Sequence, residues 1–334
     1  MSNKKQIITI SLISLLFTLI FPPLGIAPIV FLFSVKIKGW DWVIFFSIFF
    51  GLLFLLNFAT WFNSSLNLHE MLISFLIISL QYLIIPIIFA FLFNLLFKLS
   101  NRYKTPILIT ILLGSIPFFI YIGGIVLFIK QSGYSIMQLL PFAESTTFQD
   151  PEVAEEIKNL ISRAYYDILP KGITAFSILI SFLVEQHFVY YIKKGGSIMN
   201  GYIKPIETSF LPKLFSFITM IGMYTLLILN FILKIKNQAL EIFLYNIFFL
   251  CTTVHFINGI GVIVALVKRG LSKYMIQLND TFTQKPALKL LINISLIMLI
   301  ILVLPYIIYL YIAIAFLSTI DSVYNFRKLP DKAS

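Results

Sequence analysis

The sequence predicts an all-α protein, a polytopic transmembrane helix bundle, and three observations support this class. Hydrophobic residues make up 59% of the 334 residues and charged residues 12%, whereas soluble domains hold about 45–50% apolar and about 25% charged residues. Long apolar runs without Lys or Arg match the length needed to cross a hydrocarbon core of about 30 Å. The basic residues lie in the gaps between these runs, and most fall in every second gap. These features indicate that lipid surrounds most of the chain.

Six central runs are long enough for helical crossings, because about 20 residues at helical rise span the core. They are Val43–Phe62, Met71–Phe97, Ile107–Ile129, Ile173–Ile192, Leu214–Leu233 and Leu240–Val267. Within them, the only charged residues are Glu185 and Glu241. The chain is predicted to make about eight membrane crossings, plus short broken or hairpin segments in the two terminal regions. The stretch Gly270–Pro286 is more polar and is interpreted as a cytoplasmic loop.

Both terminal apolar regions contain prolines, which break or kink a helix. We therefore expect a short broken or hairpin segment near Pro22-Pro23 and another near Pro305. The first apolar run, Ile7–Phe21, follows a basic N-terminus as a signal peptide would. Its one suitable small residue, Ala27, is followed by Pro28, which would block cleavage. The run is therefore interpreted as a retained membrane segment.

The distribution of charge predicts how the chain is threaded, because cytoplasmic loops are enriched in Lys and Arg. With both termini in the cytoplasm, nineteen of the 25 basic residues lie in cytoplasmic gaps and six on the opposite side. Residues 1–330 then form one integral membrane domain, and 329–334 form a short cytoplasmic tail. The net charge of +11 does not indicate nucleic-acid binding, because the basic residues lie at span ends instead of on one basic face.

The segment Lys130–Lys171 is predicted to lie outside the cytoplasm and holds six of the fourteen acidic residues. Asp150-Pro151 is typical of a helix start, with an N-cap residue and proline at the first helical position. Apolar residues then recur at helical spacing as far as Leu169. We expect an amphipathic helix over Asp150–Leu169, either a surface helix resting on the membrane or bundle, or a lid over a ligand site.

One polar stripe lies inside a predicted span. Thr174, Ser177, Ser181 and Glu185 are separated by three, four and four residues, which places them on one helix face. Glu185 lies about 12 Å along the helix from the boundary at Lys193. Polar groups at such depth are costly and often functional. The stripe is interpreted either as part of a ligand or ion site, or as a carboxyl buried neutral or hydrogen-bonded between helices.

A second polar group lies on the run Leu240–Val267, where His255 and Asn258 are neighbours on the helix surface. His255 needs a partner at this depth, and Glu185 is a candidate on chemistry alone. The alternative for each of these side chains is hydrogen bonding between helices. The tentative ligand-binding residues are Glu185, Ser181, His255, Asn258 and Gln81.

No catalytic, cofactor-binding or metal-binding residues are predicted, and we expect no enzyme activity. The sequence contains no phosphate-binding glycine-rich loop, no His-Glu-x-x-His and no dinucleotide fingerprint. Its one cysteine, Cys251, cannot form an intramolecular disulfide. Any energy from ATP must come through a partner chain.

Several landmarks resemble, in their order and spacing, the YybS-like family of uncharacterised bacterial membrane proteins. The similarity covers about residues 7–328, and its landmarks are Asp167–Pro170, Lys193–Gly196, Phe210–Pro212, His255–Gly259, Lys268-Arg269 and Asp321–Lys328. The last of these is the most distinctive.

This resemblance implies a multi-pass protein of the bacterial cytoplasmic membrane, distantly similar to the S subunits of energy-coupling factor transporters. Those subunits bind a vitamin or metal ion and work with a membrane coupling subunit and ATPases. The chain departs from them in its first helix, which has Ser11, Ser14 and Thr18 in place of Ala-xxx-Ala packing motifs. Two functions are therefore considered: a solute-binding or transport subunit, and a non-catalytic scaffold that associates with envelope-assembly proteins.

Overall fold

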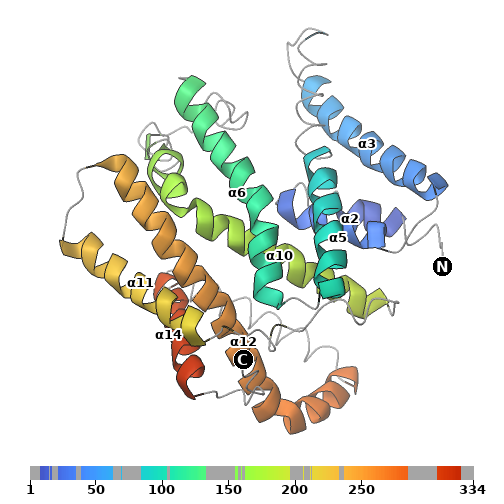
Figure 1. Ribbon diagram of the computed structural model, residues 1–334. Helices are drawn as coiled ribbons and strands as arrows, with labels where there is room; N and C mark the ends of the chain where they lie inside the picture. Colours follow the sequence, from blue (N-terminus) through green and yellow to red (C-terminus); the bar gives the residue numbers. More distant parts are fainter. Residues whose placement is uncertain are drawn as a thin grey trace. The chain divides into compact units, whose positions relative to one another are not determined.

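Every regular element in the part of the chain described by the computed structural model is helical. The structure describes residues 8–14, 16, 22–34, 39–62, 69, 84–103, 106–132, 155–156, 159, 162–195, 206, 211, 213–232, 237–284 and 307–324. The helices are α2 (Pro22–Ser34), α3 (Gly39–Phe62), α5 (Ile85–Tyr103), α6 (Ile107–Ser132), α10 (Leu169–Gly195), α11 (Lys213–Ile232), α12 (Gln238–Gln284) and α14 (Ile307–Tyr324) (Figure 1). A π-helical turn, η2 (Ala164–Ile168), immediately precedes α10. The all-α class is confirmed for these residues.

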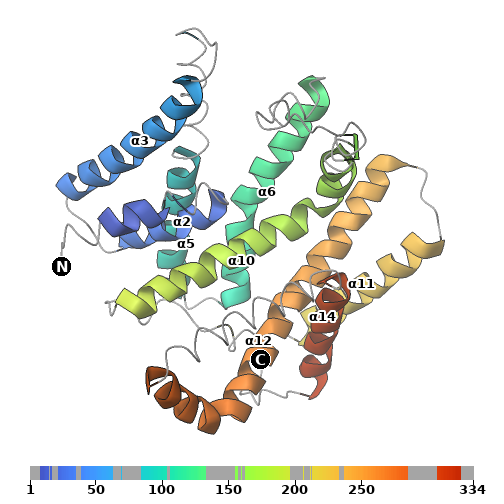
Figure 2. The same cartoon turned by 180° about the vertical axis from the view of Figure 1, so that it is seen from behind.

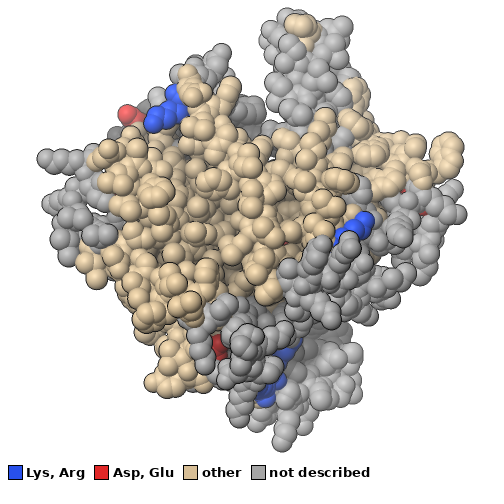
Figure 3. Space-filling model, viewed as in Figure 1, with Lys and Arg blue, Asp and Glu red and all other residues tan. Residues whose placement is uncertain are grey.

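Three of these helices contain segments long and apolar enough to cross a membrane, judged by length and composition. The segments are Ile107–Phe128, Tyr166–Val189 and Gln238–Gly270. Shorter apolar segments lie in α3, α5, α11 and α14. Many large hydrophobic side chains on these helices are exposed, and most of the described surface visible in Figure 3 is neither basic nor acidic. Such surfaces are typical of proteins that contact lipid, so the protein is membrane-embedded.

The chain forms two compact units, and the helices α6 and α10 contribute to both. Unit 1 comprises Met1–Thr105, Ile109–Ile120 and Leu179–Ile203, and unit 2 comprises Pro106–Leu108, Tyr121–Ile178 and Lys204–Ser334. Each unit is described by itself.

Aromatic side chains form much of the core of unit 1. Helix α2 packs against α5, and Phe93 and Phe97 of α5 are buried. The ring of Phe118 in α6 lies 5.8 Å from that of Phe93, and Phe188 of α10 stacks on Phe97 at 4.7 Å. A Cβ on Gly114 of α6 would lie only 2.6 Å from the hydroxyl of Ser181 and 2.9 Å from Phe93. Glycine therefore permits the close approach of α6 to α10 and α5.

Unit 2 contains a three-helix group made of α11, α12 and α14, which contact one another (Figures 1 and 2). Helices α12 and α14 approach closely at Gly259 of α12, where an added Cβ would overlap the carbonyl oxygen of Ile314 in α14. A small residue at a helix crossing lets two backbones meet, as is common in membranes. Gly259 therefore determines how closely α12 and α14 pack.

The start of the chain agrees with the short segment predicted near Pro22-Pro23. The hydroxyl of Ser14 donates to the carbonyl of Gly25 at 3.0 Å. Residues eleven positions apart on one straight helix would be about 16 Å apart, so these two helical pieces pack side by side. Helix α2 starts at Pro22. The region around Pro305 lies outside the described residues, and α14 starts shortly after it.

One prediction is wrong, because α12 continues to Gln284 through most of the expected loop Gly270–Pro286. No proline occurs between Gly270 and Pro286, so nothing in that stretch forces the helix to end. Polarity marks where a span leaves the lipid, but not where the helix stops.

The predicted amphipathic helix Asp150–Leu169 is described only in part. Residues 155, 156, 159, 162 and 163 are helical, and the predicted N-cap at Asp150 lies outside the described residues. The helix then passes through η2 directly into α10. Pro170 has no N–H and cannot donate to the carbonyl four residues before it, as an α-helix requires. A π-helical turn accommodates such a break in the α-helical pattern.

Candidate functional site

The polar stripe predicted on α10 is present on one helix, but its members contact different partners. In unit 2, Thr174 bonds to Asn246 through its backbone N–H and its hydroxyl, and Ser177 donates to the carbonyl of Ile173 in its own helix. In unit 1, Ser181 donates to the carbonyl of Ile111 in α6 at 2.8 Å. These bonds satisfy the hydroxyl groups, and those of Thr174 and Ser181 also join α10 to another helix.

Glu185 differs from the rest of this stripe. It lies one turn after Ser181, and the side chain is 2% exposed. Its Oε2 atom has no hydrogen-bond partner among the described residues, and the same holds for Nε2 of the adjacent Gln186. A buried polar atom without a partner costs free energy. Such an atom in a native structure therefore calls for an explanation, which a bound water, an ion or a ligand group can supply.

Several buried residues close to Glu185 on α10 are apolar or aromatic. Phe188, three residues further along α10, is buried and stacks on the buried Phe97 of α5. Phe182 and Val184 are also buried. Glu185 belongs to neither the Lys171–Asp167 nor the Lys171–Glu241 ion pair. A carboxyl group in such a place can contact a solute that reaches it, and no ion pair of Glu185 is found among the described residues.

His255 occupies a contrasting environment in unit 2. Its side chain is fully buried, its Nε2 lies 2.8 Å from the hydroxyl of Thr219 in α11, and its Nδ1 lies 3.1 Å from that of Ser318 in α14. Asn258 donates from Nδ2 to the same Ser318 hydroxyl at 2.8 Å. The group His255, Asn258, Thr219 and Ser318 is called the polar seam below. It joins all three helices of the group.

The donors and acceptors of the polar seam fit a neutral tautomer of His255. The hydroxyl of Thr219 donates its one proton to the carbonyl of Phe215, at 2.8 Å, or of Ser216, at 3.1 Å. With its proton on one of these carbonyls it accepts from His255, and the imidazole proton then lies on Nε2. Nδ1 then accepts from the hydroxyl of Ser318. Every ring nitrogen has a partner with the neutral imidazole, so the seam needs no ligand to complete it.

The five predicted ligand-binding residues are therefore not equivalent. His255 and Asn258 share Ser318 and act as interhelical hydrogen-bonding residues, and Ser181 bonds to α6. Glu185 alone among those described has a buried side-chain oxygen without a partner in the described structure. Gln81 lies outside the described residues. Their role in ligand binding stays a prediction.

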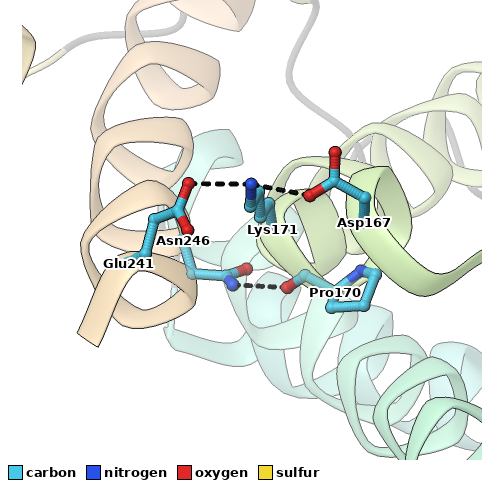
Figure 4. Close-up of polar contacts among 5 residues, drawn as sticks. All are labelled: Asp167, Pro170, Lys171, Glu241 and Asn246. Atoms are coloured by element: carbon cyan, nitrogen blue, oxygen red, sulfur yellow. Dashed lines mark hydrogen bonds and ion pairs between the residues drawn. The ribbon is translucent and has the colours of Figure 1, made fainter. Parts of the chain in front are cut away.

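Sequence reasoning missed a cluster at the N-terminal ends of α10 and α12. Nζ of Lys171 lies 2.6 Å from a carboxylate oxygen of Asp167 and 2.8 Å from one of Glu241 (Figure 4). It also lies 5.3 Å from the ring centre of Tyr245. The side chain of Asn246 donates to the carbonyl of Pro170 at 2.7 Å. These contacts fix the start of α10 against the first turns of α12.

Local sequence signals exist for parts of this cluster. Asp167 and Lys171 have the i, i+4 spacing of a helical ion pair. Asn237 is the N-cap of α12, because its Oδ1 accepts from the backbone N–H of Ala239 and Leu240 at 3.0 and 3.2 Å. Glu241 follows in the first turn, where the helix dipole favours an acid. No signal in the sequence predicts that Glu241 meets Lys171, seventy residues earlier.

No group of three or more His, Cys, Asp or Glu side chains that could hold a metal ion occurs among the described residues. Comparison with known proteins adds no further assignment, since no protein-family model, curated protein or solved structure matches this chain. The resemblance to the YybS-like family stays a prediction from the motifs quoted above.

Proposed function

We propose that this protein is a solute-binding or transport subunit, similar in role to the S components of energy-coupling factor transporters, and that Glu185 contacts the solute. The observation that carries the proposal is the buried Oε2 of Glu185, which has no partner among the described residues. A purely structural carboxyl would be expected to bond to a neighbouring helix, as Ser181 and His255 do. A solute with a complementary group would satisfy it.

The proposal includes a topology for the chain. We place about eight crossings in the cytoplasmic membrane of a bacterium, with both termini in the cytoplasm. Three segments long enough to cross a membrane, four shorter apolar segments and the 19-to-6 division of basic residues support this arrangement. The cluster around Lys171 then lies at the outer face of the membrane.

The proposal also includes partners. The sequence contains no nucleotide-binding loop, so active uptake through this subunit requires other chains. By analogy with energy-coupling factor transporters, we expect a membrane coupling subunit and ATPases. Purification from native membranes in mild detergent, followed by identification of the co-purified proteins, tests this part of the proposal.

Thermal stability in lipid nanodiscs tests solute binding directly. The purified protein is screened against vitamins, metal ions and organic cations, and a ligand is expected to raise the melting temperature because it binds only the folded state. Glu185→Gln keeps the size of the side chain but removes its ability to carry a negative charge, and it should abolish the ligand-induced shift.

Ser115→Ala is the matched control for loss of a buried polar group in the same unit. The side chain of Ser115 is buried, and its hydroxyl donates to the carbonyl of Leu112 in its own helix. This variant should keep the full ligand-induced shift. A screen in which no solute stabilises the protein, or in which Glu185→Gln responds as the native protein does, would contradict the proposal.

A membrane scaffold is the second candidate, and the length of α12 favours it. The apolar segment ends at Gly270, whereas the helix continues to Gln284, roughly 20 Å further. A helix that extends beyond the membrane is a suitable contact for another protein. Shortening α12 after Gly270 while retaining the downstream chain should release co-purified proteins. Loss of coupling and ATPase subunits would support transport, and loss of envelope-assembly proteins would support a scaffold.

A further inference from the structure

We propose that Glu185 binds a monovalent organic cation in exchange for a proton. This inference rests on the proposed function and adds the class of solute and the chemistry of its binding. Three features carry it: the burial of Glu185 without a partner for Oε2, the scarcity of basic groups around it, and the aromatic residues that line its helix face.

The first step concerns charge. Helices α5 and α6 both contact α10 in unit 1, through Phe97 and through Ile111 and Gly114. Among their described side chains in this unit, one is ionisable, Lys98 of α5, and it is exposed. On α10 itself the nearest ionisable described side chain is His187, which is half-buried. A carboxylate carries a large cost in apolar surroundings unless a cation accompanies it.

The second step concerns exchange. Without a cation at the site, Glu185 keeps its proton and stays neutral. When a cation enters, the O–H bond of the carboxyl breaks, the proton leaves to water, and the carboxylate pairs with the cation. One positive charge enters and one leaves, so the net charge of the site is unchanged. The buried site thereby avoids both an isolated carboxylate and an isolated cation.

The third step concerns the kind of cation. A single carboxyl group is a poor metal site, and the described residues provide no cluster of three ligating side chains. Aromatic rings are abundant instead, because Phe89, Phe93, Phe97, Phe118 and Phe188 form a continuous series of ring contacts in unit 1. Aromatic faces attract organic cations. A solute with one positive charge and an apolar or aromatic body matches both features.

The experiment measures binding and proton release together on the full-length protein in lipid nanodiscs. The probes are choline and thiamine, whose quaternary nitrogens remain charged at every pH used, and 3,3-dimethylbutan-1-ol, the neutral isostere of choline. Binding is followed by calorimetry, and released protons by an indicator dye in weakly buffered solution. We expect about one proton released per cation bound, and an apparent affinity that rises about tenfold per pH unit. The neutral isostere should not bind.

Two variants complete the experiment. Glu185→Gln should lose both cation binding and proton release, and Ser115→Ala should keep both. The exchange is overturned, and solute binding retained, if cations bind without releasing protons or with the same affinity at every pH. The cation class is overturned if the neutral isostere binds as tightly as choline, or if only neutral or anionic solutes stabilise the protein. Absence of stabilisation by any solute overturns the proposed function itself.

Discussion

Glu185 in unit 1 and His255 in unit 2 are both buried polar side chains on apolar helices, yet their surroundings are opposite. Each ring nitrogen of His255 has a hydroxyl partner, from Thr219 in α11 and Ser318 in α14. The Oε2 atom of Glu185 has none among the described residues. From sequence alone both are polar groups at membrane depth, and both are candidates for ligand binding.

The difference shows that burial does not by itself identify a functional residue. A polar side chain in a membrane helix is retained either because it joins helices or because it meets something that the protein alone does not provide. Counting donors and acceptors separates the two cases. The count assigns His255 to helix packing and leaves Glu185 as the candidate for chemistry.

The largest expected effect is that of Gly259→Ala, which tests the close approach of α12 and α14 beside the polar seam. Gly259→Ala places a Cβ on the carbonyl of Ile314, and we expect the free energy of unfolding to fall by about 2–4 kcal/mol. Gly270→Ala is the control on the same helix, because a Cβ added there would meet no atom within 4 Å. It should be neutral or stabilise by up to about 1 kcal/mol. Equal effects of the two variants, measured by denaturant titration, would disprove the close crossing.

Two matched substitutions test whether Glu185 and His255 have different roles. His255→Leu removes the partner of Thr219 and Ser318, and we expect a loss of about 1–2 kcal/mol. Glu185→Leu replaces a buried carboxyl that lacks a partner for Oε2, and we expect stability to stay equal or to rise by about 1–3 kcal/mol. A loss of stability in His255→Leu without a loss in Glu185→Leu, measured by unfolding titrations, would support the assignment of the two residues. A large loss of stability in Glu185→Leu would place Glu185 with His255 as a packing residue.

The smallest expected effect concerns the cluster around Lys171, which has an ionic and a neutral part. The side chains of Lys171, Asp167 and Glu241 are 20%, 49% and 29% exposed. Lys171→Met should therefore lower the free energy of unfolding by less than about 1 kcal/mol, and by less still at about 1 M salt. Asn246→Leu removes bonds to backbone groups of α10 and should cost about 1–2 kcal/mol at any salt concentration. Melting curves at low and high salt distinguish the two parts. A salt-dependent effect of Asn246→Leu would contradict this division.

Hydropathy predicted where the helices lie along the chain. The runs Val43–Phe62, Ile107–Ile129 and Leu214–Leu233 correspond closely to α3, α6 and α11. This success has a simple cause, since a span must be apolar over a length determined by the bilayer. The same property explains why the extension of α12 to Gln284 was missed. Outside the lipid, helix formation no longer requires apolar residues.

The sequence did not predict which helix faces contact one another. In a soluble protein, the apolar face of a helix is the side that packs against the core. In a membrane, the faces that contact lipid are also apolar, so apolarity does not identify the packing face. The stripe from Thr174 to Glu185 was correctly placed on α10, yet its members bond to Asn246, to their own helix and to α6. Only three-dimensional packing distinguishes Glu185 from the three hydroxyl groups that precede it.

The π-helical turn Ala164–Ile168 has a consequence for the phase of the helix that it precedes. A π-turn holds one residue more than an α-turn, so side chains before it are rotated by about 100° relative to a continuous α-helix. The described helical residues just before Ala164 and the polar stripe that starts at Thr174 therefore follow two separate helical phases. Deleting one residue from the turn would join them into a single periodicity, and the side chains at 162 and 163 would face a different direction.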